Sequence, residues 1–498
     1  MNIFNKKIML ILLVAATTLA IFSACDEDDD IQATTASNGE TDSGGNDKTA
    51  RIAPTLPDYD WQGYIFKIPV SDLSGTTMEN WQSRDITSEE ATGDPINDAV
   101  YRRNMVLQNK YNFGIERVFV DNPAGILGML RNAIAAGDNQ FDCVSISLFG
   151  AAMAATEGLF ADLFEVEYLD FEKPWWDKNA IEGISIGNRL FFASGDCVLA
   201  NKDACAAILF NKPLLADLAL ENPYDLVKNN KWTIGKLYEM SRAAAADLNG
   251  NGKMDSDSDR FGFIPNITLD SKALYQGMGV RIAAKDADDL PFLTYMSERT
   301  FNIIDIWNEL LHAKFTWHPY VDIVYSGDDM AERVFADGRG LFFSTVIRSV
   351  EHFRSMDTDF GILPVPWLDE NQRKWYHGVD YFVGQAIAVP AFLADDYVAL
   401  DRAGFMIEAI TSESKYTVIP AYYDVQLTGK FIRDDESSEM LDIIFGSTLW
   451  DPGIIYDWFE LLNGISFSEY STPSGYEKRI GKIETAMQKT IDAFAKLN

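Results

Sequence analysis

A run of oxygen-bearing side chains near the middle of the chain has the spacing of a calcium-binding loop. Asp or Asn occupies the first, third, fifth and ninth places of the segment 247–258, and Gly252 occupies the sixth. This pattern resembles an EF-hand loop, in which oxygen ligands surround the ion, the glycine allows a sharp turn and the seventh residue offers its backbone carbonyl. The predicted metal ligands are Asp247, Asn249, Asn251, Lys253 through its carbonyl oxygen, Asp255 and Asp259.

The end of this loop departs from the EF-hand pattern. The twelfth place is Ser258, where a bidentate glutamate is usual. Asp257 or Asp259 could complete the coordination shell if the loop is one residue longer. The alternative to a structural Ca²⁺ ion is a solvated Asn-Gly turn without metal. We favour calcium, because the loop stands between two apolar segments that an ion could clip together.

Cys25 is a candidate for lipid attachment. Residues 1–24 have two lysines near the start, an apolar stretch and small residues before the cysteine, as a secretory leader does. A leader that ends before a cysteine resembles a bacterial lipoprotein signal, although Phe22 stands where leucine is usual. The alternatives are an uncleaved anchor and an ordinary secretory leader, but the apolar stretch is short for the roughly 20 residues that span a bilayer. We expect attachment to the cell membrane through lipid alone, on its extracytoplasmic face.

Composition and charge exclude several classes of function. The chain has 498 residues, 47% of them hydrophobic, which suffices for two lobes with separate cores. Its net charge of −33 argues against nucleic acid and against a polybasic membrane contact, and favours neutral or cationic small ligands. The segment 183–187 fits G-x-S-x-G, but a nucleophile elbow needs a strand before it and a helix after it, and a hairpin is expected instead. The sequence therefore gives no catalytic residue.

Cysteine and histidine spacing predicts neither a disulfide framework nor a histidine metal site. The cysteines other than Cys25 are odd in number, at Cys143, Cys197 and Cys205, and so cannot all be paired. Cys197 and Cys205 could pair across a short loop, but we favour buried free thiols. The four histidines lack metal-site spacing.

Strand and helix patterns alternate along most of the chain after a polar tether at 25–55. Strands are expected at 64–70, 115–120 and 141–146, with helices at 97–111 and 126–136 between them, which predicts a parallel sheet flanked by helices. A Gly187-Asn188 turn should lead into another strand, and Thr233 should cap a helix. The remaining expectations are strands at 189–193, 206–211, 341–343 and 361–366, and mostly helix after residue 400.

Several of these segments, in their order, resemble the extracellular solute-binding proteins of sugar-uptake ABC transporters, the maltose-binding-protein-like family. The segments that carry this likeness are 187–192, 209–215, 231–237, 335–343 and 360–366. A clade of such lipoproteins from anaerobic, mostly Gram-positive bacteria is similar at 92–99, 173–176 and 418–425. The resemblance implies an α/β, two-lobed type 2 periplasmic-binding fold, with a hinge and a ligand between the lobes.

The same resemblance implies how the lobes divide and what they bind. Lobe 1 would comprise 56–195 plus 365–429, and lobe 2 would comprise 196–364 plus 430–498. We expect a monomeric binding protein, not an enzyme, that captures a carbohydrate and delivers it to the ABC permease subunits. The alternatives are an extracellular carbohydrate-active enzyme and a surface glycan-binding lipoprotein without a transport role.

Residues in polar loops or beside the implied lobe crossings are the candidates for ligand binding. A sugar presents flat C–H faces and a rim of hydroxyls, so its site combines aromatic rings with carboxylate, amide or guanidinium groups. The alternative for each aromatic residue is ordinary core packing. The candidates are Trp81, Arg84, Trp175, Asp196, Asp203, Tyr381 and Trp450.

Overall fold

The computed structural model describes residues 51–74, 76, 79–137, 140–265, 274–317, 327–356, 358–427, 435–460 and 470–496. The predicted leader, Cys25 and all but the end of the predicted tether lie outside these residues. The chain divides into two compact units, Met1–Arg51 and Ile52–Asn498, and the description below concerns the second. None of the helices within the described ranges has both the length and the apolar character needed to cross a bilayer.

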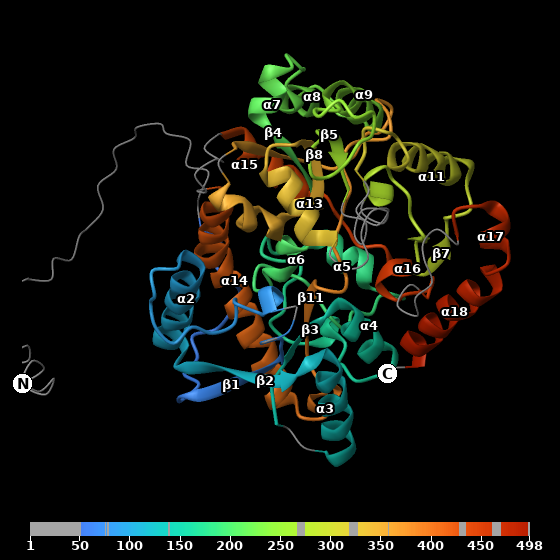
Figure 1. The fold of residues 1–498 in the computed structure, drawn as a ribbon. Helices are drawn as coiled ribbons and strands as arrows, with labels where there is room; N and C mark the ends of the chain where they lie inside the picture. The colour runs from blue at the N-terminus through green and yellow to red at the C-terminus, as the bar shows by residue number, and fades with distance from the viewer. Residues whose placement is uncertain are drawn as a thin grey trace, which may run out of the picture. The chain divides into compact units, whose positions relative to one another are not determined.

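The first strand pair forms where the sequence predicts it. β1 (Tyr64–Asp72) and β2 (Phe113–Asp121) pair in parallel, with Tyr64 opposite Phe113 (Figure 1). The intervening α2 (Pro95–Tyr111) begins where the Asp94 side chain accepts a hydrogen bond from the Asn97 amide. α3 (Asn122–Ala136) follows β2 and contacts both strands. The predicted β-α-β-α order is therefore confirmed.

The third predicted strand pairs in the opposite sense from the one expected. β3 (Val144–Ser147) forms its ladder with β11 (Gln385–Ala388), and the two strands run antiparallel. β11 belongs to a segment more than 200 residues later in the sequence, so local alternation held no information about it. The prediction of an all-parallel sheet in this lobe is wrong at this strand.

A second, four-stranded sheet is fully buried and forms the centre of the other lobe. Its order is β5-β8-β4-β9, with β4 antiparallel to β8 and β9, and β5 parallel to β8. Helix α9 (Ile234–Ala244) lies so close to β5 that a Cβ at Gly262 would meet the Ser241 backbone at 1.9 Å. Only glycine allows this approach. The bounds are β4 (Ala206–Asn211), β5 (Phe261–Ile264), β8 (Gly340–Val346) and β9 (Phe360–Leu363).

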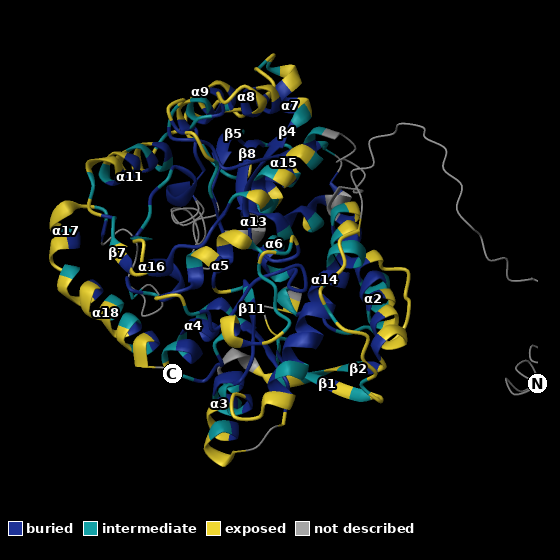
Figure 2. Ribbon diagram, turned by 180° about the vertical axis from the view of Figure 1, so that it is seen from behind, coloured by how far each residue is buried: buried dark blue, intermediate teal, exposed yellow. Residues whose placement is uncertain are grey.

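Helices surround this sheet with exposed outer faces and buried inner faces (Figure 2). Thr233 caps α9 as predicted, because its hydroxyl accepts a hydrogen bond from the Lys236 amide. The other helices of this region are α7 (Lys212–Asp217), α8 (Pro223–Lys228), α11 (Glu298–Leu311), α13 (Gly327–Ala336) and α15 (Asp435–Gly446).

Short elements fill the region between the two sheets and the C-terminus. Two small strand pairs join β6 to β7 and β10 to β12. α18 reaches back toward the first lobe, since the Phe494 ring lies 4.8 Å from that of Phe191. The lobe boundaries stay a prediction. The bounds are β6 (Ala283–Lys285), β7 (Pro291–Leu293), β10 (His377–Gly378), β12 (Thr448–Leu449), α4 (Leu148–Thr156), α5 (Lys178–Ile184), α6 (Ala200–Asp203), α16 (Pro452–Ile455), α17 (Pro473–Glu477), α18 (Ile480–Lys496), and the 3₁₀ helices η1 (Glu79–Trp81), η2 (Leu163–Glu165), η3 (Ile347–Ser355) and η4 (Ala391–Leu393).

The predicted strand at 189–193 is absent, although the turn before it is present. Gly187 and Asn188 both have positive φ, as a two-residue hairpin turn requires. Beyond the turn, the segment makes only isolated bridges, such as Ala193 with Ile387. Its apolar side chains are buried, so the apolar run that suggested a strand marks a core-crossing segment instead.

The cysteines within the described residues are buried free thiols. Cys143, Cys197 and Cys205 form no disulfide. Burial raises the pKa of Cys197 and of Cys205 to about 12. The favoured interpretation from the sequence is confirmed.

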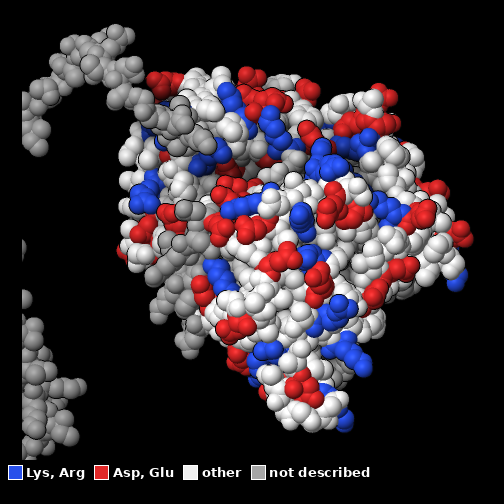
Figure 3. All heavy atoms as spheres, turned by 90° about the horizontal axis from the view of Figure 1, so that it is seen from above, with Lys and Arg blue, Asp and Glu red and all other residues white. Residues whose placement is uncertain are grey.

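Charges of both signs cover the surface. Figure 3 shows Asp and Glu interspersed with Lys and Arg over the face that it presents. Some of the acidic side chains form ion pairs, for example Glu157 with Arg131.

Helix α14 (Tyr397–Leu427) is a long element that contacts the loop at 174–177. It packs on α2, and its Glu408 is fully buried. The indole N–H groups of Trp175 and Trp176 donate to the two carboxylate oxygens of Glu408, each at 3.0 Å. Burial raises the pKa of Glu408 to about 7, although the two indole hydrogen bonds oppose the shift.

Glu408 should therefore make stability depend on pH. Its pKa in the folded chain lies above its ordinary value, so its contribution is complete below about pH 4.5 and is lost as the pH rises toward 7. We expect the free energy of unfolding of the wild type, relative to Glu408→Gln, to fall by up to about 3 kcal/mol between pH 4.5 and 7.5. Denaturant titrations of both proteins across this range measure the difference, and a difference that does not vary with pH would contradict the assignment.

Candidate ligand-binding cavity

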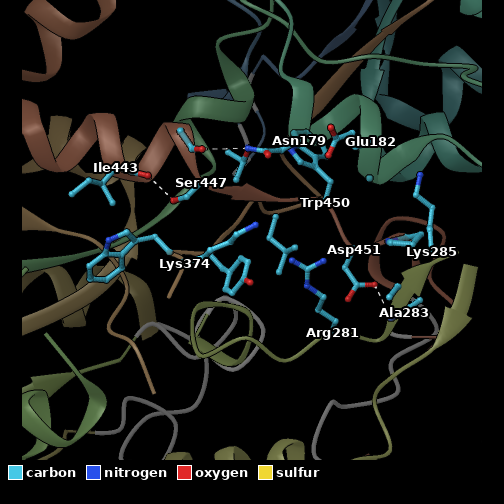
Figure 4. A pocket seen from close by; sticks show the side chains of 18 of the residues that line it. Asn179, Glu182, Arg281, Ala283, Lys285, Lys374, Ile443, Ser447, Trp450 and Asp451 are labelled. Atoms are coloured by element: carbon cyan, nitrogen blue, oxygen red, sulfur yellow. Dashed lines mark hydrogen bonds between the residues drawn. The ribbon is translucent and has the colours of Figure 1, made fainter. Parts of the chain in front are cut away.

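A cavity of about 690 Å³ lies where segments from both predicted lobes meet. One wall is α5, and the facing walls are β6, the segment 374–376 and the residues from the end of α15 to the start of α16. Figure 4 shows side chains from these segments converging on one space. Its volume lies within the range of small-molecule sites. Asn179, Arg281, Lys374, Tyr376 and Trp450 are the lining residues on which the argument depends.

Trp450 forms one wall and is held in place at both ends. Its indole N–H donates to Asp177 Oδ2 at 3.1 Å. Gly183 of α5 packs directly against it, since a Cβ there would lie 2.3 Å from the Trp450 carbonyl oxygen. The ring is 3% exposed, so it forms part of the core as well as of the cavity wall.

Asp451 joins two segments on the side of the cavity that faces α5, through their backbone amides. Its carboxylate accepts hydrogen bonds from the amides of Ile282 at 2.6 Å, Ala283 at 3.3 Å and Gly453 at 2.8 Å. Burial raises its pKa to about 6, and these amides oppose the shift. The start of β6 and the start of α16 are therefore fixed beside each other, with Arg281 next to this junction.

His377 holds the loop before Trp450 in place through hydrogen bonds of its two ring nitrogens. Its Nε2 accepts a hydrogen bond from the Val365 amide at 3.0 Å, and its Nδ1 lies 2.8 Å from Ser447 Oγ. Because Ser447 donates to the Ile443 carbonyl, Nδ1 carries the proton and donates to Ser447. Complete burial lowers the pKa of His377 to about 3, so the ring is neutral.

A second cavity of about 470 Å³ adjoins the first. The two share Asn179, Asp442, Gly446 and Thr448. The second extends toward Trp176, Lys202 and Lys415. The shared residues show that the two cavities lie next to each other.

Only some of the predicted ligand-binding residues reach these cavities. Trp450 lines the first cavity, and Asp196 lines the second. Asp196 is paired there with Lys202 at 3.5 Å and Lys415 at 3.6 Å. Trp450 is more deeply buried than its polar sequence neighbours suggest.

Trp175 and Tyr381 lie in the core. Trp175 is 1% exposed and lines neither cavity, whereas its neighbour Trp176 lines the second. The indole N–H groups of both tryptophans reach Glu408, but only Trp176 lines a cavity. Tyr381 is 2% exposed and stacks on Phe382 at 4.6 Å. Trp81, in η1, is half-buried and packs against the core.

Arg84 and Asp203 are brought together with each other, away from both cavities. Arg84 Nη2 lies 3.1 Å from Asp203 and 3.0 Å from Glu351. Arg348 and the Tyr422 hydroxyl also contact the Asp203 carboxylate. Burial raises the pKa of Asp203, and the two guanidinium groups oppose the shift. This cluster links the loop after β1 to α6, η3 and α14.

Sequence inspection missed most of the residues that line the first cavity. Lys374, Trp375 and Tyr376 form a cation next to two aromatic residues, a signal that was present in the sequence. Arg281 and Asn179 carried no such signal, because the residues next to them in the sequence are typical of ordinary loops. Their importance comes from the tertiary contacts of Asp451 and Trp450.

The predicted calcium loop is organised by its own backbone. Asp247 accepts hydrogen bonds from the amides of Gly250 and Gly252, both at 2.7 Å. Asp259 accepts from the Leu248 amide at 2.9 Å and the Asp255 amide at 2.8 Å. Across the described ranges, no three or more His, Cys, Asp or Glu side chains gather as a metal-binding group. The calcium ion stays a prediction.

Solved structures of similar fold cover most of the chain. The maltose-binding periplasmic protein MalE from Listeria monocytogenes, in complex with maltose, is 14% identical with a TM-score of 0.53, covering 87% of this chain and 99% of its own. UspC from M. tuberculosis is 15% identical with a TM-score of 0.52, covering 86% and 100%. A sugar transporter protein from Rhizobium etli, in an open conformation, is 13% identical with a TM-score of 0.51, covering 88% and 100%.

No protein-family model and no curated protein matches the sequence. At these identities the likeness establishes the fold. The chain therefore has the two-lobed α/β fold of the maltose-binding-protein-like solute-binding proteins, as its sequence predicts.

Proposed function

We propose that this protein captures a carbohydrate between its two lobes, outside the cytoplasm, and delivers it to an ABC permease. The cavity that joins the two predicted lobes is the observation that supports this most directly. It combines an aromatic ring, Tyr376, with amide, guanidinium and ammonium groups from Asn179, Arg281 and Lys374. Rings that cover the C–H faces of a sugar and polar groups that bind its hydroxyls are what a carbohydrate site requires.

The fold supports the same proposal. MalE, which has this fold, is in complex with maltose, and the Rhizobium etli protein is described as a sugar transporter. In a two-lobed protein, a ligand that contacts both lobes favours the closed state because it gains contacts that the open state lacks. A groove walled by α5 on one side and by β6 and the α15–α16 segment on the other suits such closure. We infer binding and delivery, without catalysis, as the role of this site.

We further propose that lipid on Cys25 holds the protein at the membrane, and that Ca²⁺ binds the loop 247–259. The leader before Cys25 and the polar tether support the first. The oxygen pattern of the loop supports the second, with Asp247, Asn249, Asn251 and Asp255 as side-chain ligands. Neither part is required for sugar binding itself.

Replacing Tyr376 by Ala should weaken carbohydrate binding about tenfold or more, because an aromatic anchor in a site contributes ~1–2 kcal/mol. The half-exposed ring supports little of the core, so the melting temperature should change little. Tyr376→Phe should retain most of the affinity, because it keeps the ring. Calorimetric titration of the leader-free protein against an oligosaccharide panel, paired with melting curves, measures both.

Trp232→Ala is the matched control for that substitution. Trp232 is 0% exposed and donates to the Pro364 carbonyl oxygen at 2.8 Å, so its loss should cost about 3–5 kcal/mol of stability. Binding per folded molecule should survive. If Tyr376→Ala binds with full affinity, this cavity is not the carbohydrate site. Turnover products in the titrated sample would favour a carbohydrate-active enzyme instead.

Cys25→Ala should release the protein from the membrane fraction or block its processing, because the acylated side chain would be absent. Fractionation and gel mobility of the full chain, expressed with its leader, measure the effect. Membrane attachment and mobility identical to those of the wild type would argue against lipidation at Cys25.

Calcium should raise the melting temperature of metal-stripped protein, because an ion that binds only the folded state stabilises it by mass action. Asp247→Ala should abolish this response. Asp286→Ala is the matched control: Asp286 also accepts loop amides, from Asp288 and Leu290, but stands outside the calcium pattern. Superimposable melting curves with calcium and with chelator would exclude an ion in this loop.

A further inference from the structure

We propose that the preferred carbohydrate is anionic, carrying a carboxylate or sulfate group that Arg281 and Lys374 bind. This inference rests on the proposed function and specifies the ligand class of the same cavity. It runs against the expectation from the net charge of −33, which by itself favours a neutral or cationic ligand. The local arrangement of charges in the cavity is the reason for the difference.

Arg281 is positioned as an anion receptor. Its guanidinium group lies over the ring of Tyr376, 5.0 Å from the centroid. A guanidinium group stacked on an aromatic face keeps its in-plane N–H donors free for a planar anion. Its backbone position is fixed because the next amide, that of Ile282, donates to buried Asp451 at 2.6 Å. Figure 4 shows the guanidinium pointing into the cavity.

Lys374 brings a second positive charge to the same space from a different segment. Its side chain also points into the cavity in Figure 4, and it lies two residues before Tyr376. Within the part of the chain that the structure describes, neither Lys374 nor Arg281 forms an ion pair at 4.0 Å or less with a carboxylate. Arg281 does interact electrostatically with the nearby Asp451 carboxylate. The N–H donors of both cations nevertheless remain available to a ligand.

The other charged groups of the cavity are largely occupied by the protein itself. The third cation, Lys285, is paired with Asp289 and also donates to Ser185. The Asp451 carboxylate accepts three backbone amides. Asp442 accepts a hydrogen bond from the Tyr423 hydroxyl at 3.1 Å. Exposed Glu182, on the α5 wall, is the remaining carboxylate of the lining.

Two available cations on the walls that face α5, and one exposed carboxylate on α5 itself, give the cavity a polarity. An anionic substituent would lie between Arg281 and Lys374, and the hydroxyls of the same sugar would face Asn179 and Glu182. Binding at this site satisfies charges that a neutral ligand would leave solvated, so the charged ligand gains affinity relative to its uncharged counterpart.

The experiment titrates the leader-free protein with matched oligosaccharides by calorimetry. The panel contains uronate trisaccharides, their neutral methyl esters, sulfated trisaccharides and maltotriose. We expect the carboxylate or sulfate members to bind at least tenfold more tightly than their uncharged counterparts. Comparing the uronate with the sulfated trisaccharides identifies which anion is preferred. Arg281→Gln and Lys374→Gln should each weaken binding of the anionic member about tenfold, and should weaken binding of its methyl ester several-fold less.

Arg373→Gln is the matched control, because Arg373 is the exposed neighbour of Lys374 and does not line the cavity. It should bind like the wild type. Melting curves of each variant confirm that the fold is intact. Equal or tighter binding of neutral members would overturn the anionic preference and leave carbohydrate capture standing. Binding of no member of the panel would overturn both.

Discussion

A buried carboxylate must find hydrogen-bond donors, and much of the binding region depends on how Asp451 does so. It draws the amides of Ile282, Ala283 and Gly453 to one point. An ionised group removed from water without such donors would cost several kcal/mol. Because β6 and α16 share this one acceptor, Arg281 and Trp450 take up fixed places on adjoining walls. The cavity is thus shaped by a backbone junction before any ligand contacts it.

A similar rule operates at the other buried acids. Glu408 is satisfied by two indole N–H groups, and Asp203 by two guanidinium groups and a tyrosine hydroxyl. Each acid joins segments that are far apart in the sequence. The Asp203 cluster connects the loop after β1 to η3, which belong to different predicted lobes, so a hinge motion that separated these segments would have to break or reorganise it. Buried ion pairs of this type add little net stability but specify one arrangement.

The fold could be predicted where local pattern decides structure. Strand-like sequence patterns identified β1 and β2, and the cap at Thr233 identified the start of α9. The prediction failed where long-range packing decides. The apolar run at 189–193 has no ladder partner along its length, and β3 pairs with a strand far downstream.

The binding region was harder to predict for the same reason. A guanidinium group and a carboxylate, such as those of Arg84 and Asp203, can bind sugar hydroxyls, but they can equally bind each other. Residue type alone does not tell which of these partners the side chain has in the folded protein. Trp450 was identified because it stands beside Asp451 in a loop, whereas Arg281 was missed because its role comes from a contact about 170 residues away in the sequence. Residue type indicates which chemistry is available, and tertiary contacts decide where it is used.

The buried thiols have a consequence for how such a chain matures. Cys197 and Cys205 are surrounded by protein, and their raised pKa keeps them protonated, in the form that does not attack disulfides. Disulfide-exchange catalysts would have no reactive thiol to engage in the folded unit. The second unit can therefore reach its final covalent state as soon as it folds, and that state would be the same in a reducing and in an oxidising compartment.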